Sequence, residues 1–373
     1  MRHLNRTLSC LISTIILIFF IIYLIYSAWT TTKFNFVFNG TPSLRFSYAL
    51  SQPLVNKVNE DNLQKNSLIV SFDQINQDFA KFSFKFSGED VLIFLHIQKT
   101  AGTSFERFLV RSKLNISNPC ICEEGQKRCD CEIIDKFGKK RIWLFSRYST
   151  GWVDWACGLH ADFTKLVVAN CVDYYFKIKE GQSKNRFYLT TFIREPIDRF
   201  ISEFSHVKRG ARWKRVQHFC NNMSECLQFD LVKEVELDEF LNCPHNLAFN
   251  RQTRMLADLT LIGCDNLIFS DTPTSHFGRL MLESAKKNLQ NKFAFFGIKE
   301  RMNESQILFE NIFNVKFSDS LSNWNLSKSS DIFVSADQLA QIKQKNQLDL
   351  ELYSFANKLF NKRIEEFKIR GRL

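Results

Sequence analysis

The sequence lacks several patterns that would assign it to a common class of protein. It has no internal repeat, and it contains only 13 glycines and 6 prolines in 373 residues, a scarcity that by itself indicates no function. The Walker A pattern G-x-x-x-x-G-K-[ST] is absent, which excludes the usual signature of a nucleoside triphosphate-binding loop. The composition is otherwise ordinary for a globular protein, with 45% hydrophobic and 24% charged residues.

Charge is missing from one long stretch near the start. Residues 7–32 contain no charged side chain, and residues 8–29 are dominated by Ile, Leu and Phe. Such a stretch rises about 33 Å as an α-helix, which is enough to cross a bilayer. The alternative is a cleaved signal peptide, but its apolar core is usually only about 7–15 residues, so an uncleaved anchor is favoured. Because basic residues precede the stretch, the positive-inside rule predicts a cytosolic tail at 1–7, a transmembrane signal anchor at 8–29 and a lumenal remainder.

The cysteines fit this topology. Ten of the eleven follow the predicted anchor, where an oxidising lumen allows disulfides to form. Cys120, Cys122, Cys129 and Cys131 form a C-x-C…C-x-C pattern and not the C-x₂₋₄-C spacing of zinc sites, so disulfides are favoured over a metal. Four cysteines allow three pairings, and the sequence does not choose among them. Asn-x-Ser/Thr sequons, which agree with passage through the secretory pathway, occur at Asn39, Asn115, Asn222, Asn303 and Asn325.

The net charge predicts an anionic partner. The chain carries a formal +11, and removing the two arginines of the tail leaves +9 for the lumenal part. A basic surface favours polyanions, and in the lumen the polyanion is a sulfated glycan and not a nucleic acid; the other interpretation is that the charge serves solubility. Residues 30–78 are rich in Asn, Ser, Gln and Lys with little periodicity, and this predicts a stem that leads to a lumenal domain at 79–373.

Strands alternate with helices in the lumenal part. The apolar run Val91–Leu95 predicts a buried strand, followed by a loop and a helix over about 103–111. A second strand is predicted at 187–193, and Pro196 fits the first position of a helix that continues to about Arg209. This alternation predicts an α/β sheet. Near the end, a helix with one buried face is indicated by Leu348, Leu352, Phe355 and Leu359.

The turn after the first strand has the mechanics of an anion site. It reads His96-Ile-Gln-Lys-Thr-Ala-Gly-Thr-Ser104 and leads into a helix N-terminus, where unpaired N–H groups and the helix dipole favour an anion. Gly102 lets the backbone come close, and Lys99 supplies a point charge. From these residues alone, an anion site and a plain capping turn are equally good interpretations.

This loop resembles the 5′-phosphosulfate-binding loop of the heparan-sulfate 6-O-sulfotransferases. The resemblance covers about residues 90–370. It continues in order through Pro119-Cys-Ile-Cys, Gly125-Gln-Lys-Arg-Cys-Asp-Cys131, Trp143-Leu-Phe-Ser-Arg-Tyr-Ser-Thr-Gly-Trp152, Cys157-Gly-Leu-His-Ala-Asp162, Arg194-Glu-Pro-Ile-Asp-Arg-Phe-Ile-Ser-Glu203, His206-Val-Lys-Arg-Gly-Ala-Arg-Trp213, Asn250-Arg-Gln-Thr-Arg-Met-Leu-Ala-Asp258, Ser284-Ala-Lys-Lys-Asn-Leu289 and Ala294-Phe-Phe-Gly297.

The resemblance implies a fold and an activity. The fold would be the P-loop-like α/β sulfotransferase fold, with a central parallel sheet flanked by helices and one N-terminal transmembrane helix before it. The reaction would move a sulfuryl group from 3′-phosphoadenosine 5′-phosphosulfate (PAPS) onto the 6-hydroxyl of glucosamine in heparan sulfate, by in-line displacement and without a metal. The implied location is the Golgi membrane, in single-pass type II topology. Two alternatives stay open: sulfation at another position such as the 2-hydroxyl of uronic acid, or an inactive glycan-binding Golgi protein.

The resemblance also assigns roles to residues. Lys99 would offset charge on the leaving phosphate, His160 would accept the proton of the acceptor hydroxyl, and Arg194 and Ser202 would contact the 3′-phosphate. The cofactor-binding loop would comprise His96, Ile97, Gln98, Lys99, Thr100, Ala101, Gly102, Thr103 and Ser104. A looser match adds Ser322, Asn323, Trp324, Lys328 and Ser329 to the cofactor contacts. The saccharide would be bound by Lys127, Arg128, Arg147, Trp152, His160, His206 and Trp213.

Three departures from the family pattern stand out. Ala101 replaces the usual second glycine of the loop, and we expect the extra methyl group to cost little if φ is negative there. Glu195 stands where an aspartate is common, which is a mild change. Val153–Ala156 form an insertion of about three residues beside His160, which affects the shape predicted for the acceptor cleft.

Overall fold

The computed structural model describes most of the chain beyond the predicted stem. The described residues all fall within the unit Leu68–Leu373, and they are 84–86, 89–149, 157–180, 185–211, 219–220, 235–243, 246–269, 272–321 and 332–369. The predicted anchor at 8–29 and stem at 30–78 lie outside them. Within these ranges, no helix has the length and apolar character needed to span a bilayer.

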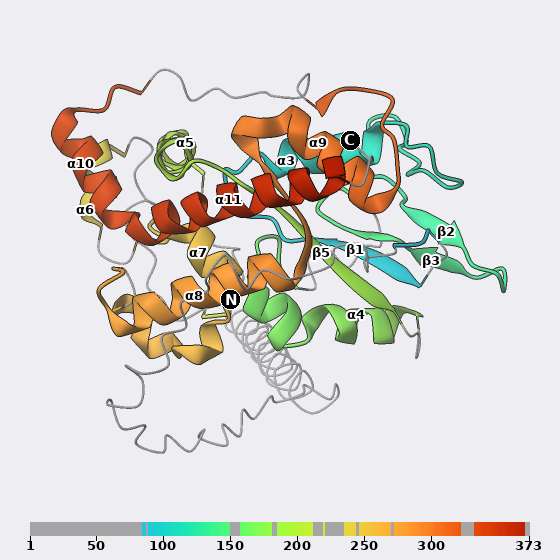
Figure 1. The fold of residues 1–373 in the computed structure, drawn as a ribbon, viewed down its shortest axis with the longest axis horizontal. Coiled ribbons are helices and arrows are strands. Elements are labelled where there is room, and N and C mark those ends of the chain that lie inside the picture. The colour runs from blue at the N-terminus through green and yellow to red at the C-terminus, as the bar shows by residue number, and fades with distance from the viewer. Residues whose placement is uncertain are drawn as a thin grey trace, which may run out of the picture. The chain divides into compact units, whose positions relative to one another are not determined.

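A four-stranded parallel sheet forms the centre of the described fold (Figure 1). Its order is β4-β1-β5-β6, with bounds β1 Asp90–Phe94, β4 Leu144–Phe145, β5 Arg186–Ile193 and β6 Phe293–Ile298. Every residue of β1 and β6 is buried, as the apolar run predicted for β1. A short antiparallel hairpin adds β2 Glu132–Ile134 and β3 Lys140–Ile142. The α/β sheet predicted from the sequence is therefore confirmed.

Helices cover the sheet. Figure 1 shows α3 and α9 on one side of the strands and α4 and α8 on the other. The α-helices are α3 Gly102–Arg111, α4 Cys171–Glu180, α5 Pro196–Lys208, α6 Leu237–Asn242, α7 Arg251–Leu256, α8 His276–Asn291, α9 Met302–Phe313, α10 Ala336–Lys345 and α11 Gln347–Ile369. Shorter turns are η3 Thr164–Val168, η5 Leu259–Leu261, η6 Cys264–Phe269 and η7 Lys299–Arg301. The four apolar residues predicted to share one face near the end are all buried on α11.

Phenylalanine fills the space between helices and sheet. The buried Phe105 of α3 lies with ring centroids 4.7 Å from Phe192 of β5 and 5.3 Å from Phe309 of α9. Aromatic rings of this size dominate the free energy gained by burial. Gly297 of β6 makes this packing fit, because a Cβ added there would lie 2.3 Å from the Phe192 ring. The sequence contains 38 phenylalanines, and the buried ones build this core.

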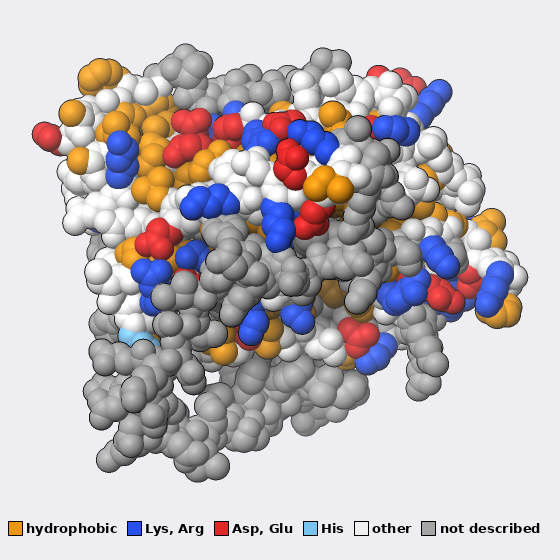
Figure 2. All heavy atoms as spheres, in the orientation of Figure 1, with side chains coloured by type: hydrophobic (Ala, Val, Ile, Leu, Met, Phe, Trp, Pro, Cys, Tyr) orange, Lys and Arg blue, Asp and Glu red, His pale blue; other side chains and the backbone are white. Residues whose placement is uncertain are grey.

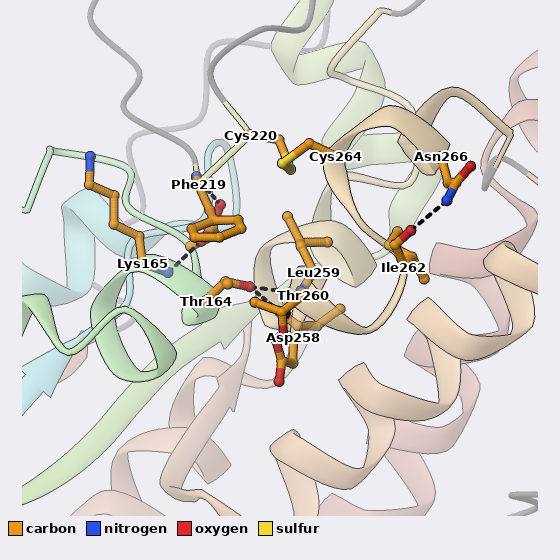
Figure 3. Close-up of a disulfide and its surroundings, with 12 residues drawn as sticks. Thr164, Lys165, Phe219, Cys220, Asp258, Leu259, Thr260, Ile262, Cys264 and Asn266 are labelled. Carbon is orange, nitrogen blue, oxygen red and sulfur yellow. Dashed lines mark hydrogen bonds between the residues drawn. A yellow bond between two sulfur atoms is a disulfide. The ribbon is translucent and has the colours of Figure 1, made fainter. Parts of the chain in front are cut away.

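Disulfides hold the loops around the sheet, as predicted. Cys120–Cys131 and Cys122–Cys129 are nested, which selects one of the three pairings that the sequence allowed. Two further disulfides, Cys157–Cys171 and Cys220–Cys264, join cysteines that are 14 and 44 residues apart in the sequence. Cys243 is disulfide-bonded as well. Figure 3 shows the surroundings of Cys220–Cys264, where the Thr164 hydroxyl accepts a 2.8 Å hydrogen bond from the Leu259 amide.

The surface charge is mixed on the face shown in Figure 2. Basic and acidic side chains alternate there among the described residues. Arg279 and Lys286 of α8, for example, both lie within ion-pair distance of Glu351 on α11. This face therefore presents no continuous basic surface in the described part of the chain.

Candidate functional site

The site lies where β1 and β5 end, at one edge of the parallel sheet. The Leu95 amide donates to the Thr190 carbonyl at 2.9 Å, and the Thr191 hydroxyl donates to the Leu95 carbonyl at 2.8 Å. These bonds set the loop after β1 beside the residue after β5. Arg194 completes the junction, because its Nη1 donates to the Lys99 carbonyl at 3.3 Å. Ligands of open α/β sheets bind at this edge, as predicted for Arg194 from its position.

The loop after β1 turns back sharply onto helix α3. Lys99 and Ala101 both have left-handed backbone angles, with φ of 65° and 73°. In the part of the chain that the structure describes, no side chain caps the N-terminus of α3, and the first turn of this helix holds no acidic residue. Such an N-terminus directs unpaired N–H groups and a positive dipole toward an anion. Gly102 allows the start of α3 to pack closely against the end of β1 and the loop, since a Cβ at this position would lie 3.1 Å from the Phe94 ring and 3.2 Å from the His96 ring.

The backbone at Ala101 corrects one expectation. The methyl group of Ala101 was expected to lower the stability of the loop only slightly, on the condition that φ is negative. The observed φ is 73°, because the residue is the N-cap of α3 and must reverse the chain there. An L-residue is strained in this region. The condition is therefore not met, and the replacement of glycine by alanine at this position carries a cost.

Several cations converge on the loop. Burial and the nearby Arg209 lower the pKa of Lys99, with Arg194 adding to the effect and Glu203 opposing it. Burial also lowers the pKa of Arg194, which is only 5% exposed, while Asp198 partly offsets this. The Arg194 Nε is buried and has no hydrogen-bond partner among the described residues. Partly desolvated cations of this kind gain most from an anionic ligand.

Helix α5 carries the two other predicted residues of this region. Ser202 is buried, and His206 lies one turn further along the same helix. Burial, Lys99 and Arg209 lower the pKa of His206 to about 4. His206 is therefore neutral at neutral pH, and its ring can both donate and accept a hydrogen bond.

A buried ionic network joins α5 to the start of α7. Glu203 accepts hydrogen bonds from Arg199 on its own helix and from Arg251, whose Nε lies 2.9 Å from a Glu203 oxygen. All three side chains are almost fully buried. The two arginines hold the pKa of Glu203 below its ordinary value despite its burial. The network fixes α5 to the start of α7 beneath the site.

The loop is joined to the predicted saccharide residues through Glu106, which sequence reasoning missed. Glu106 is fully buried on α3 and hydrogen-bonds with the His96 Nδ1. It also accepts a 2.7 Å hydrogen bond from the Arg147 amide, and the Arg147 guanidinium lies 3.5 Å from the Thr103 hydroxyl. Arg147 is thus brought next to the loop of residues 96–104.

His160 also lies beside the loop. Its Nδ1 is 3.0 Å from the His96 carbonyl oxygen, and the two imidazole centroids are 5.0 Å apart. A carbonyl only accepts, so Nδ1 carries the proton, and in the neutral ring Nε2 carries the lone pair. The Cys157–Cys171 disulfide ties down the segment that holds His160. This tautomer is the one that a proton acceptor at Nε2 needs.

Some of the remaining predicted site residues are described by the structure, and others are not. Lys127 and Arg128 lie on the turn enclosed by the nested disulfides, and that turn reaches the Arg147 segment through a 2.8 Å bond from the Cys129 amide to the Tyr148 carbonyl. Gln98 is buried in the cofactor loop, and neither end of its amide has a partner among the described residues. Outside the described residues lie Trp152, the Val153–Ala156 insertion, Trp213, Ser322, Asn323, Trp324, Lys328 and Ser329.

Comparison with known proteins identifies the family. The model of the sulfotransferase family matches residues 82–356. Heparan-sulfate 6-O-sulfotransferase 3 of Mus musculus and that of Homo sapiens are each 43% identical over 304 residues, which is 78% of this chain and 62% of the relative. Heparan-sulfate 6-O-sulfotransferase 1-B of Danio rerio is 42% identical over 294 residues, which is 76% of this chain and 69% of the relative.

These matches extend far beyond the cofactor loop. The chain spans less than two thirds of the length of the two type 3 relatives, but the matched region includes the whole described sheet and site. The resemblance noted from the ordered motifs is thereby confirmed. The chain belongs to the sulfotransferase family and, within it, to the heparan-sulfate 6-O-sulfotransferases.

Proposed function

We propose that this protein transfers a sulfuryl group from PAPS to the 6-hydroxyl of glucosamine residues in heparan sulfate. The observation that carries the proposal is the 42–43% identity to heparan-sulfate 6-O-sulfotransferases across the site-bearing region. The geometry supports it, because three features lie together: a helix N-terminus that no described side chain caps, a buried arginine whose Nε has no partner among the described residues, and a histidine of defined tautomer.

The donor binds along the edge of the sheet. The N-terminus of α3 and Lys99 receive the 5′-phosphosulfate, and Arg194 with Ser202 receives the 3′-phosphate. The chemistry of these groups fits a bis-anionic nucleotide, because burial disfavours the charged forms of Lys99 and Arg194 until an anion binds, and no described side chain caps the helix N-terminus. Gln98 adds to the same loop a buried amide that no described residue hydrogen-bonds.

Transfer proceeds by in-line displacement at sulfur. The acceptor oxygen forms the new bond to sulfur while the bond from sulfur to the bridging oxygen breaks, and 3′-phosphoadenosine 5′-phosphate leaves. His160 takes the proton of the attacking hydroxyl at Nε2, and its Nδ1–H stays on the His96 carbonyl. Lys99 offsets the negative charge that grows on the departing phosphate.

The acceptor chain lies on the side of Arg147. Lys127, Arg128 and Arg147 bind its sulfate and carboxylate groups, and the neutral His206 contributes a hydrogen bond. Trp152 and Trp213 complete this part of the proposal as apolar surfaces for the sugar rings. We place the protein in the Golgi membrane as a single-pass type II protein, anchored through residues 8–29 with its catalytic domain in the lumen.

One assay separates the proposed activity from its two alternatives. The full-length chain in detergent is incubated with labelled PAPS and N-sulfated heparosan, and the product disaccharides are analysed. Label at C6 of glucosamine is the expected result. Label on uronic acid would indicate the 2-O activity, and retained glycan binding without label would indicate an inactive binding protein.

A histidine substitution tests the proposed base. His160→Ala is expected to keep PAPS binding, because none of the proposed donor contacts is removed, and to reduce turnover by about 10²–10⁴-fold. His276→Ala serves as the matched control, since His276 is exposed at the start of α8. Near-normal turnover of a folded His160→Ala protein would remove His160 from the chemistry.

A further inference from the structure

Gln252 holds the backbone of Arg194 from both sides. The Arg194 amide donates to the Gln252 Oε1 at 2.9 Å, and the Gln252 Nε2 donates to the Arg194 carbonyl at 2.9 Å. Gln252 is fully buried on α7, 58 residues along the chain. Arg194 lies between the end of β5 and the start of α5, so its peptide groups are beyond both regular ladders. The glutamine amide therefore replaces the bonds that a strand would have given.

Gln252 is itself fixed by the start of α11. The backbone N–H of Gln252 donates to one Asp349 carboxylate oxygen at 3.1 Å, and the backbone N–H of Thr253 donates to the other at 2.7 Å. The Asn250 side chain in turn accepts from the Leu348 amide at 3.1 Å. The two helix starts thus cap each other, and all these groups are buried. The Gln252 side chain consequently offers Arg194 a rigid support.

The side chain of Arg194 is held less completely than its backbone. Nη1 makes a 3.3 Å bond to the Lys99 carbonyl, and Nη2 lies 3.8 Å from the exposed carboxylate of Asp198. Nε is buried with no partner in the described residues. The guanidinium keeps donor capacity for a ligand, and its direction depends on where the backbone at 194 is held. A small shift of that backbone would misalign a bidentate contact.

We propose that Gln252 is a positioning residue for donor specificity: it sets the Arg194 guanidinium so that the protein distinguishes a nucleotide with a 3′-phosphate from one without it. This inference rests on the proposed function, since that function makes Arg194 the contact to the 3′-phosphate. It adds a residue that touches no ligand and acts only through the Arg194 backbone.

The test measures nucleotide binding directly and does not depend on turnover. Calorimetry on the full-length chain gives the affinities for adenosine 3′,5′-bisphosphate and for adenosine 5′-phosphate, and their ratio reports the 3′-phosphate contact. Gln252→Met removes both amide bonds at similar volume. The matched control is Asn246→Leu, because Asn246 is also buried and bonds the backbone twice, to the Phe240 carbonyl and the Ala248 amide.

We expect Gln252→Met to lower the ratio about tenfold, equivalent to about 1.4 kcal/mol, through weaker binding of the bisphosphate alone. Asn246→Leu should leave the ratio unchanged, whatever it does to stability. An unchanged ratio in Gln252→Met, or an equal fall in both variants, overturns the inference. If Gln252→Met does not fold, Gln252→Leu also removes both amide bonds without adding a charge, and its ratio decides in the same way.

The failure of the proposed function gives a different result. A wild-type protein that binds the two nucleotides equally has no 3′-phosphate site, and this contradicts the proposed donor and the inference together. A wild-type preference for the bisphosphate that survives in Gln252→Met contradicts the inference alone.

Discussion

Ala101 provides a test in which the structure fixes the sign of the effect. Its φ of 73° and ψ of 10° lie in the left-handed region. An L-residue there costs roughly 1–2 kcal/mol, whereas glycine adopts these angles without strain. Glycine loses about 0.5–1 kcal/mol more in conformational entropy on folding. The balance predicts that Ala101→Gly raises the free energy of unfolding by about 0.5–1 kcal/mol.

The same substitution elsewhere supplies the control. Ala257 is buried at the end of α7 with φ of −76°, so glycine there relieves no strain. Ala257→Gly also removes a buried methyl group, and we expect a loss of about 1–2 kcal/mol. The two proteins differ from the wild type by the same atoms and should move in opposite directions.

Urea unfolding with the disulfides kept oxidised measures both variants. The midpoint should rise for Ala101→Gly and fall for Ala257→Gly at an unchanged denaturant slope. A fall of similar size in both would mean that Ala101 is not strained in solution, and it would refute the left-handed turn before α3. A changed slope would indicate an effect on the unfolded chain and would call for native-state measurements.

Three further predictions concern ionisable side chains in and around the site. Lys99→Ala should weaken binding of adenosine 3′,5′-bisphosphate and reduce turnover about 10²-fold, and unchanged kinetics would contradict its assigned role. The pKa of His206 is about 4 in the folded protein against 6.5 unfolded, so the unfolded chain binds the extra proton between these values and stability falls as the pH drops through 6.5. Between pH 7 and pH 5, the free energy of unfolding of His206→Gln should therefore fall by about 1 kcal/mol less than that of the wild type, a figure discounted for the partial exposure of His206. Urea unfolding at the two pH values measures both falls, and equal falls would exclude the pKa shift. Glu203→Gln leaves two buried arginines without their carboxylate and should cost about 3–5 kcal/mol by the same method, whereas Glu365→Gln at an exposed ion pair should cost less than about 1 kcal/mol.

The sequence predicted the elements that depend on local patterns. The apolar run placed the first strand one residue from its observed position at Asp90–Phe94, and the second strand was observed at Arg186–Ile193. Pro196 marked the first residue of α5 because its fixed φ suits that position. The loop between β1 and α3 was likewise recognised from its order of residues. These features are encoded within a few residues of chain.

The contacts that complete the site are encoded over much longer distances. Glu106 reaches Arg147 across 41 residues, and Gln252 reaches Arg194 across 58. Neither residue stands out from the other glutamates and glutamines of the sequence, so a search for chemistry-bearing motifs passes over both. The pairing of the clustered cysteines was open for the same reason, because it depends on how two chain segments meet.

Ala101 shows that a departure from a family's sequence pattern can be interpreted only when the backbone angles at that residue are known. Alanine has the highest helix propensity, and before a predicted helix it would ordinarily be placed in the right-handed region. The structure places it left-handed because the chain must leave β1, pass Lys99 at a positive φ, and enter α3 with that helix's N-terminus uncapped toward the site. The strain and the missing cap have one cause, which is the geometry that leaves N–H groups available to an anion. A ligand that bonds those groups would therefore stabilise the turn that the sequence alone disfavours.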